Sequence, residues 1–152
     1  LGFEIEVLDI ASCDRETAQA KIFQSKILYI SGGNTFYLLQ ELKKKQLLSL
    51  IKEQIRDGLI YVGESAGAII TAKDIDYNKL MDDKTVAKEL SDTTGLDEVE
   101  FYILPHYGEE PFTDSSKKTF ETYKNQLDLM RMNNSQAVIV NDKEIKVVSE
   151  QD

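Results

Sequence analysis

Residues 59–68 read Leu-Ile-Tyr-Val-Gly-Glu-Ser-Ala-Gly-Ala, an apolar run that leads into a Gly-x-Ser-x-Gly turn. Small and apolar residues continue to Ala72 and have helical potential. This order is typical of a nucleophile elbow, in which a serine occupies the tip of a sharp turn between a strand and a helix. Crowding at such a turn requires glycine two residues before and after the serine. We therefore predict that the Ser65 hydroxyl faces solvent; the alternative is a plain strand-to-helix turn that contains a serine by chance.

A second loop rich in glycine precedes the elbow. The apolar run at residues 27–30 has the length of a strand and is expected at the buried centre of a parallel sheet. It ends in Ser31-Gly32-Gly33-Asn34. Two glycines allow the backbone to approach a ligand closely, and Asn34 is placed to cap the helix that follows.

The spacing of apolar residues predicts alternating strands and helices over the rest of the chain. Strands are expected at residues 3–10 and 99–104, helices at 14–25, 36–42, 47–55 and from 113 to Met130, a polar excursion with one short helix at 77–97, and a hairpin at 136–148 around Asn141-Asp142. This order predicts one α/β domain over residues 1–152, with a mostly parallel central sheet covered on both faces.

Composition excludes several classes of protein. The chain has 152 residues, of which 41% are hydrophobic, so it has enough apolar material for one sizeable core. The net charge of −9 argues against a nucleic-acid binder. We expect no membrane span and a cytoplasmic location, since no apolar run approaches ~20 residues and the first residues resemble no leader. The single cysteine, Cys13, excludes a disulfide framework and a metal cluster built on cysteines, and we interpret it as a buried or idle thiol.

His106 is the only histidine in the chain. If Ser65 is a nucleophile activated in the usual way, its general base can only be this residue. His106 follows a predicted strand, as do Ser65 and the Gly32-Gly33 loop, and ligands bind beyond the carboxyl ends of strands in open parallel sheets. The three features therefore converge on one edge of the sheet, although a lone histidine can also be purely structural.

An oxyanion hole follows from the same arrangement. A tetrahedral intermediate needs two N–H donors directed at the developing charge, and one is expected to be the amide of Ala66, the residue after the nucleophile. The second is expected from the Gly32-Gly33 loop. Gly33 is the better candidate, because a side chain there would obstruct the approaching carbonyl.

Three ordered motifs resemble a known family. Residues 31–36 (SGGNTF), 63–68 (GESAGA) and 104–107 (LPHY) are similar in order and spacing to peptidase E, the aspartyl dipeptidases of serine peptidase family S51. The resemblance implies a flavodoxin-like three-layer sandwich similar to class I glutamine amidotransferases. It also implies cleavage of dipeptides with an N-terminal aspartate, without metal or cofactor. It further implies that a strand-helix unit of about 30 residues precedes Leu1.

The third member of the catalytic triad departs from the family pattern. In the family it is a carboxylate in the loop after the long helix, and the matching position here is Asn134. Asparagine can orient an imidazole but cannot stabilise imidazolium with a full charge. Asp142, Glu109 and Glu110 are near enough in sequence to replace it, and the sequence leaves the choice open.

The aspartate preference is also left open by the sequence. An arginine is expected to bind the aspartyl side chain, but no arginine is adjacent to a motif; the chain contains only Arg15, Arg56 and Arg131.

Two other functions stay open. A relative with an incomplete triad could bind a small molecule or peptide without turnover. An esterase of the α/β-hydrolase fold is disfavoured, because that fold places its acid between serine and histidine, whereas a helix and hairpin follow His106 here. An exposed sheet edge could also make the chain a homodimer.

Overall fold

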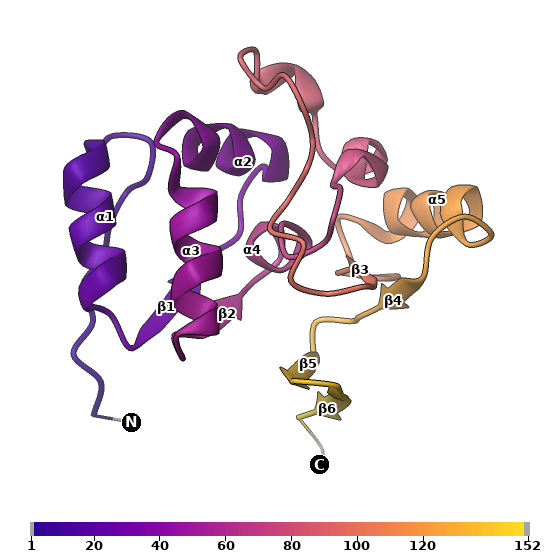
Figure 1. Cartoon of the computed structure of the whole chain (residues 1–152). Coiled ribbons are helices and arrows are strands. Elements are labelled where there is room, and N and C mark those ends of the chain that lie inside the picture. The colour runs from indigo at the N-terminus through magenta and orange to yellow at the C-terminus, as the bar shows by residue number, and fades with distance from the viewer. Residues whose placement is uncertain (1, 151–152) are drawn as a thin grey trace.

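The computed structural model describes residues 2–150, so the ends of the predicted domain, Leu1 and residues 151–152, lie outside the description. The helices are α1 (Arg15–Gln24), α2 (Thr35–Lys44), α3 (Leu47–Arg56), α4 (Ala66–Ile69) and α5 (Thr113–Tyr123), with short 3₁₀ helices η1 (Asp76–Leu80) and η2 (Lys84–Val86). The strands are β1 (Ile27–Ile30), β2 (Ile60–Gly63), β3 (Tyr102–Leu104), β4 (Leu129–Arg131), β5 (Gln136–Asn141) and β6 (Glu144–Ser149) (Figure 1).

The strands form three pairs. β1 lies parallel to β2 and β3 lies parallel to β4, while β5 and β6 form an antiparallel hairpin. The α/β class, the parallel pairing and the C-terminal hairpin are therefore confirmed. Within residues 2–150 the pairs stay separate, so one continuous central sheet is not observed.

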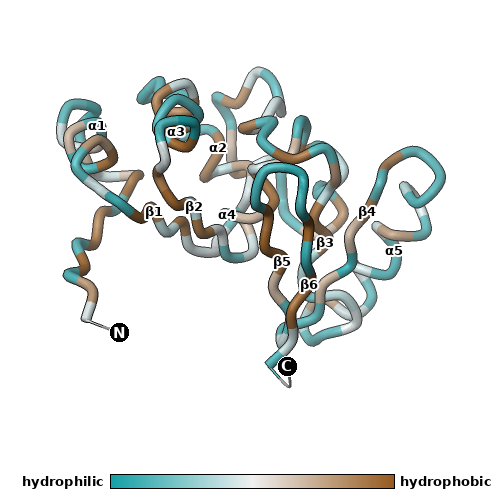
Figure 2. The backbone as a smooth tube through the Cα atoms, turned by 60° about the horizontal axis from the view of Figure 1, so that its bottom comes forward, coloured by the Kyte–Doolittle hydropathy of each residue, from teal (hydrophilic) through white to brown (hydrophobic). Residues whose placement is uncertain are grey.

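Only one face of the β1–β2 pair is covered. Leu28, Ile30 and Tyr61 pack against the main core, whereas the alternate residues of both strands are exposed, namely Ile27, Tyr29, Ile60 and Val62. Helices α1 to α3 lie on one side of this pair in Figure 2. The prediction that residues 27–30 lie at a buried sheet centre is wrong for this reason: no layer covers the other face in the described residues.

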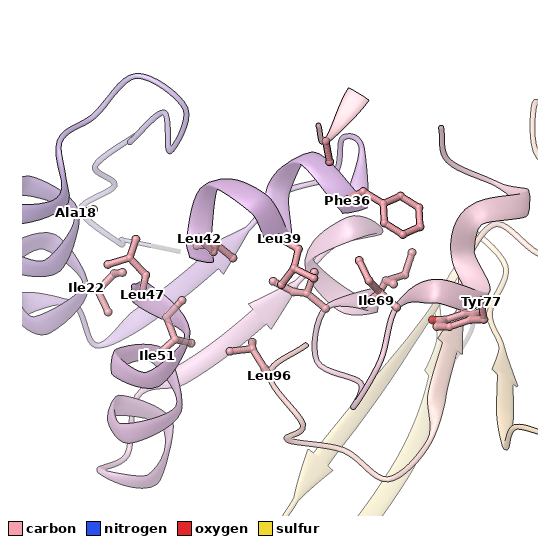
Figure 3. Close-up of a cluster of buried hydrophobic side chains, with 13 residues drawn as sticks. Ala18, Ile22, Phe36, Leu39, Leu42, Leu47, Ile51, Ile69, Tyr77 and Leu96 are labelled. Atoms are coloured by element: carbon pink, nitrogen blue, oxygen red, sulfur yellow. The ribbon is translucent and has the colours of Figure 1, made fainter. Parts of the chain in front are cut away.

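The core is built around α2. Its Phe36 and Leu39 are fully buried, and they lie between residues from the flanking elements (Figure 3). The labelled members of this core outside α2 are also buried. They come from α1, α3, α4, η1 and the segment before β3: Ala18, Ile22, Leu47, Ile51, Ile69, Tyr77 and Leu96. This packing places α2 and α4, and so both glycine loops, against one shared core.

Three further sequence-based expectations were wrong. Residues 3–10 form no strand; Ile5 and Val7 are 80% and 93% exposed, because a strand needs a partner and none lies beside this segment in residues 2–150. Met130 lies in β4 rather than on the helix, since the apolar positions after Tyr123 pair with β3. The helix after the elbow ends at Ile69 rather than Ala72.

Side chains cap the starts of α1 and α2, and the cap expected at Asn34 is confirmed. Asp14 Oδ1 accepts the Thr17 N–H at 2.7 Å, and Asn34 Oδ1 accepts the Tyr37 N–H at 3.0 Å. Gly58 follows α3 with φ of +102°, a conformation that favours glycine.

No helix among residues 2–150 is both long enough and apolar enough to span a membrane.

Candidate active site

The Gly-x-Ser-x-Gly segment forms the predicted turn, and Ser65 has an unusual backbone conformation in it. Ser65 follows β2 and immediately precedes α4, with φ of 48° and ψ of −108°. A residue other than glycine in this region costs about 1–3 kcal/mol, and such strain is concentrated at functional sites. The Ser65 carbonyl accepts from Ala68 N at 3.0 Å and Ile69 N at 2.9 Å, so the turn is closed by the first helical hydrogen bonds.

The two glycines of the motif are required by close packing. A Cβ at Gly67 would lie 2.1 Å from the Ile30 carbonyl oxygen, and a Cβ at Gly63 would lie 2.5 Å from the Gly67 carbonyl oxygen. Both distances are far inside van der Waals contact. The buried Tyr61 hydroxyl also donates to the Gly67 carbonyl at 2.6 Å, and burial raises the pKa of Tyr61. The elbow is therefore fixed from β1, β2 and α4 at once.

His106 is positioned by the parallel pair β3–β4. It follows Pro105 at the end of β3 and has φ of 56°. Beyond the strands, Met132 N donates to the Leu104 carbonyl and Tyr107 N donates to the Met132 carbonyl, each at 2.9 Å. This extension of the ladder holds the segment after β4 beside His106. The imidazole stacks on Phe112, with ring centroids 5.0 Å apart and an interplanar angle of 21°.

Ser65, His106 and Asn134 form a continuous chain of hydrogen bonds. His106 Nε2 lies 2.9 Å from Ser65 Oγ, and His106 Nδ1 lies 2.7 Å from Asn134 Oδ1. An amide oxygen can only accept, so Nδ1 carries the proton and Nε2 is left to accept from the serine hydroxyl. This is the arrangement of a nucleophile, a base and a group that orients the base.

The other candidates for the third position lie elsewhere. Asp142 occupies the turn between β5 and β6 with φ of 52°, and no hydrogen bond joins its carboxylate to His106. Glu109 contacts His106 only through the backbone, its N–H donating to the His106 carbonyl at 3.0 Å, and neither Glu109 nor Glu110 hydrogen-bonds the ring. The position beside Nδ1 is therefore taken by Asn134.

The predicted oxyanion donors are unpaired. Neither the Ala66 N–H nor the Gly33 N–H donates to a protein acceptor in residues 2–150. Gly33 has φ of +139°, which side chains rarely adopt, so glycine is required there. The loop lies against the nucleophile, because a Cβ at Gly32 would be 3.4 Å from Ser65 Cβ. Both amides can thus donate to a substrate oxygen.

A cavity of about 400 Å³ joins these residues. Ser65, His106 and the predicted Gly32, Gly33 and Asn34 line it, and so do residues that the sequence did not single out: Glu64, Ile69, Asn78, Met81, Asp82, Pro105 and Phe112. Asn78 and Asp82 belong to the polar excursion after the elbow, which carries no local motif. Its return to the active site depends on packing of η1 against the core.

None of the arginines lines this cavity. Arg15 begins α1 and Arg56 ends α3. The guanidinium of Arg131 stacks over the rings of Tyr107 and Phe120, at 5.2 Å and 4.5 Å from their centroids. The arginine expected for an aspartyl side chain is therefore absent from the cavity lining in the described residues.

Glu64 is held on the outer side of the elbow. The Tyr29 hydroxyl, on the exposed face of β1, donates to Glu64 Oε2, and this hydrogen bond raises the pKa of Tyr29. The contact ties the residue before the nucleophile to the neighbouring strand.

Comparisons with known proteins agree with this geometry. The chain is 42% identical to an uncharacterised peptidase of Pasteurella multocida (strain Pm70), over 97% of this chain and 70% of that protein. It is 39% identical to peptidase E of Shewanella sp. (strain ANA-3), over 53% of this chain and 32% of that protein. A crystal structure of a protein provisionally named peptidase E, from Listeria monocytogenes EGD-e, superposes with a TM-score of 0.88 at 36% identity, over 95% of this chain and 69% of that one.

The family model for peptidase family S51 matches residues 1–148, which confirms the resemblance drawn from the three motifs. This chain belongs to peptidase family S51.

Proposed function

We propose that this protein is a serine peptidase that hydrolyses dipeptides or short peptides with Ser65, His106 and Asn134. The observation that carries the proposal is the unbroken hydrogen-bond chain from Ser65 Oγ through the imidazole to Asn134 Oδ1. Its position beside two unpaired backbone amides and a cavity of about 400 Å³ supports the same reading.

The reaction has two halves. Ser65 Oγ attacks the peptide carbonyl while His106 Nε2 takes the hydroxyl proton, and the amides of Gly33 and Ala66 stabilise the oxyanion. The C–N bond then breaks, His106 returns the proton to the leaving amine, and an acyl-enzyme is left on Ser65. Water attacks this ester with His106 again as base, which releases the acid and regenerates the serine.

Asn134 orients the base in this scheme. Its Oδ1 accepts the Nδ1 proton and so fixes the tautomer that can receive the serine proton. Because the amide is neutral, it gives imidazolium less electrostatic help than a carboxylate would, which predicts a slower enzyme rather than an inactive one.

The finer features are part of the same proposal. Cleavage needs only protein groups, so no cofactor is invoked, and the free thiol of Cys13 suits the reducing cytoplasm. The β1–β2 and β3–β4 pairs would belong to one flavodoxin-like three-layer sandwich, supported by the match to the Listeria structure. An N-terminal aspartate is not part of this proposal, because no arginine of residues 2–150 lines the cavity to bind its side chain.

Hydrolysis of a mixed dipeptide set tests the proposal. We expect Ser65→Ala to lower turnover by on the order of 10⁴-fold to 10⁶-fold, because the nucleophile is lost. Ser12→Ala, an exposed serine before α1, is the matched control and should keep wild-type turnover. Activity that survives in Ser65→Ala would overturn the proposal, and a folded wild type without turnover would favour a binding protein.

A further inference from the structure

We propose that the cavity beside Ser65 binds a positively charged ammonium group of the substrate, through Asp82 and Asn78. The ammonium could be a free α-amino terminus or a lysine side chain, since the two share the same chemistry. That the bound molecule is a substrate rests on the proposed function, but its binding can be measured without turnover.

Asn78 supplies the first observation. Its side chain is 1% exposed and the residue lines the cavity. Its Nδ2 donates to Asp82 Oδ2 at 2.9 Å and to Thr35 Oγ1 at 3.1 Å, and a bond to a carboxylate fixes which end of the amide is nitrogen. The Asn78 Oδ1 is thereby left buried without a hydrogen-bond partner. A buried acceptor of this kind is rare unless a ligand or water satisfies it.

Asp82 supplies the second, independent observation. Its Oδ2 accepts from Thr35 N at 2.8 Å and from Thr35 Oγ1 at 2.6 Å, as well as from Asn78. All three donors are neutral. No lysine or arginine in residues 2–150 forms an ion pair with Asp82, and the lysines of its own segment, Lys79 and Lys84, both pair with Asp76 instead.

The charge balance of the cavity favours a cation. The carboxylate residue Asp82 lines it, whereas the carboxylate of Glu64, another lining residue, is hydrogen-bonded by Tyr29 on the outer side of the elbow. No lysine or arginine of residues 2–150 lines the cavity. An ammonium carries three donors and no acceptor, so it can satisfy Asn78 Oδ1 and Asp82 together. A substrate carboxylate in the same place would be repelled by the Asp82 carboxylate, and no lysine or arginine of the lining would attract it. The cavity is therefore suited to amine-bearing peptides and unsuited to an aspartyl side chain.

Titration of the ¹⁵N-labelled protein with three small amides tests this binding at about pH 6.5, where an α-amino group is protonated. L-Alaninamide carries only an α-ammonium, Nα-acetyl-L-lysinamide only a side-chain ammonium, and Nα-acetyl-L-alaninamide neither. We expect at least one charged ligand to bind about 10-fold to 100-fold more tightly than the neutral one, with shifts at the amides of Thr35 and Asp82. Tighter binding of L-alaninamide identifies the group as an amino terminus, and tighter binding of Nα-acetyl-L-lysinamide identifies it as a lysine side chain.

Two isosteric variants complete the test. Asp82→Asn keeps an acceptor for Thr35 but removes the charge, and should abolish most of the preference. Asp83→Asn changes the same charge one residue later, where the carboxylate only caps η2, and should leave the preference intact. Equal affinity for the three ligands, or equal effects of the two variants, would overturn the inference. Selective binding without any peptide hydrolysis would instead sink the proposed function and leave this inference standing.

Discussion

At the scale of single residues, Ser65 and His106 share an unusual feature, since both non-glycine residues have positive φ, at 48° and 56°. Each lies two residues beyond the last residue of a parallel strand, and neighbouring backbone fixes each turn. Strain held in this way pre-organises the Ser65–His106 contact before a substrate arrives.

Substitution of Asn134 tests the third position. Asn134→Ala should lower kcat by about 10²-fold with little change in KM, because the ring loses its orienting acceptor while the cavity is kept. Asn134→Asp should keep turnover at the wild-type level or raise it, since a carboxylate stabilises the imidazolium ion as well as the required tautomer. Steady-state kinetics on one dipeptide measures both; equal losses in the two variants would show that Asn134 does not act through His106.

Part of the candidate site could be proposed from the sequence, and part could not. Ser65, His106, Gly33 and Asn134 could be named because each follows a strand end or matches a family motif. Asn78 and Asp82 could not, because the polar stretch that holds them has neither periodicity nor a motif, and only tertiary packing brings it to the cavity.

At the scale of elements, capping residues and glycines set where helices begin and end: Asn34, the predicted cap, precedes α2, and Gly58 follows α3. Two elements were missed. β4 has three residues, too few for a periodic pattern, and its apolar positions continue the spacing of α5. Residues 3–10 alternate like a strand, but pairing depends on a neighbour that local sequence does not reveal.

Gly67→Ala in the elbow and Gly32→Ala in the glycine loop beside it form a matched pair. At Gly67 the new methyl would meet the Ile30 carbonyl oxygen at 2.1 Å, so we expect a loss of about 1–3 kcal/mol or more in unfolding free energy. At Gly32 the methyl would make an ordinary 3.4 Å contact with Ser65 Cβ, so stability should change by less than about 1 kcal/mol. Urea unfolding compares them; equal stability would mean that the elbow is looser than described.

The loop after η2 is tied to α2 by an ion pair that depends on pH. Lys43 Nζ lies 2.5 Å from Asp92 Oδ1, and this contact with the Thr94 hydrogen bonds lowers the pKa of Asp92 to about 2. A folded-state pKa below the ordinary value of 3.8 means that the stabilisation is complete above that pH and is lost as pH falls through about 2.

Asp92→Asn should therefore lower the unfolding free energy at neutral pH by about 0.5 kcal/mol, a small value because the carboxylate is largely exposed and screened. The difference from wild type should shrink towards about pH 3. Urea unfolding at the two pH values measures it, with Asp128→Asn, an exposed carboxylate near α5, as control. A difference that grows on acidification would contradict the assigned ion pair.

At the scale of the whole molecule, the uncovered face of the β1–β2 pair is an exposed apolar surface. Tyr29 and Ile60 are 57% and 58% exposed, and a patch of this kind favours association. Sedimentation should show association that grows with concentration and weakens in Ile60→Lys. Val86→Lys, at an exposed apolar site on η2, should not weaken it. A clean monomer at high concentration would refute this prediction.

The order of elements was predictable because strands and helices alternate with clear turn signals, and the parallel pairs bring Ser65, His106 and the glycine loop to one region. How the strand pairs join was not predictable, since pairing over long sequence separations depends on packing rather than local pattern.

Labelling with a fluorophosphonate, followed by intact mass and peptide mapping, tests the nucleophile most directly. The reagent needs an activated serine and a formed oxyanion pocket. We predict one adduct per chain, confined to Ser65, absent in Ser65→Ala and unchanged in Ser12→Ala. A folded wild-type chain that takes no label, or that takes it at another serine, would contradict the assignment of Ser65 as nucleophile.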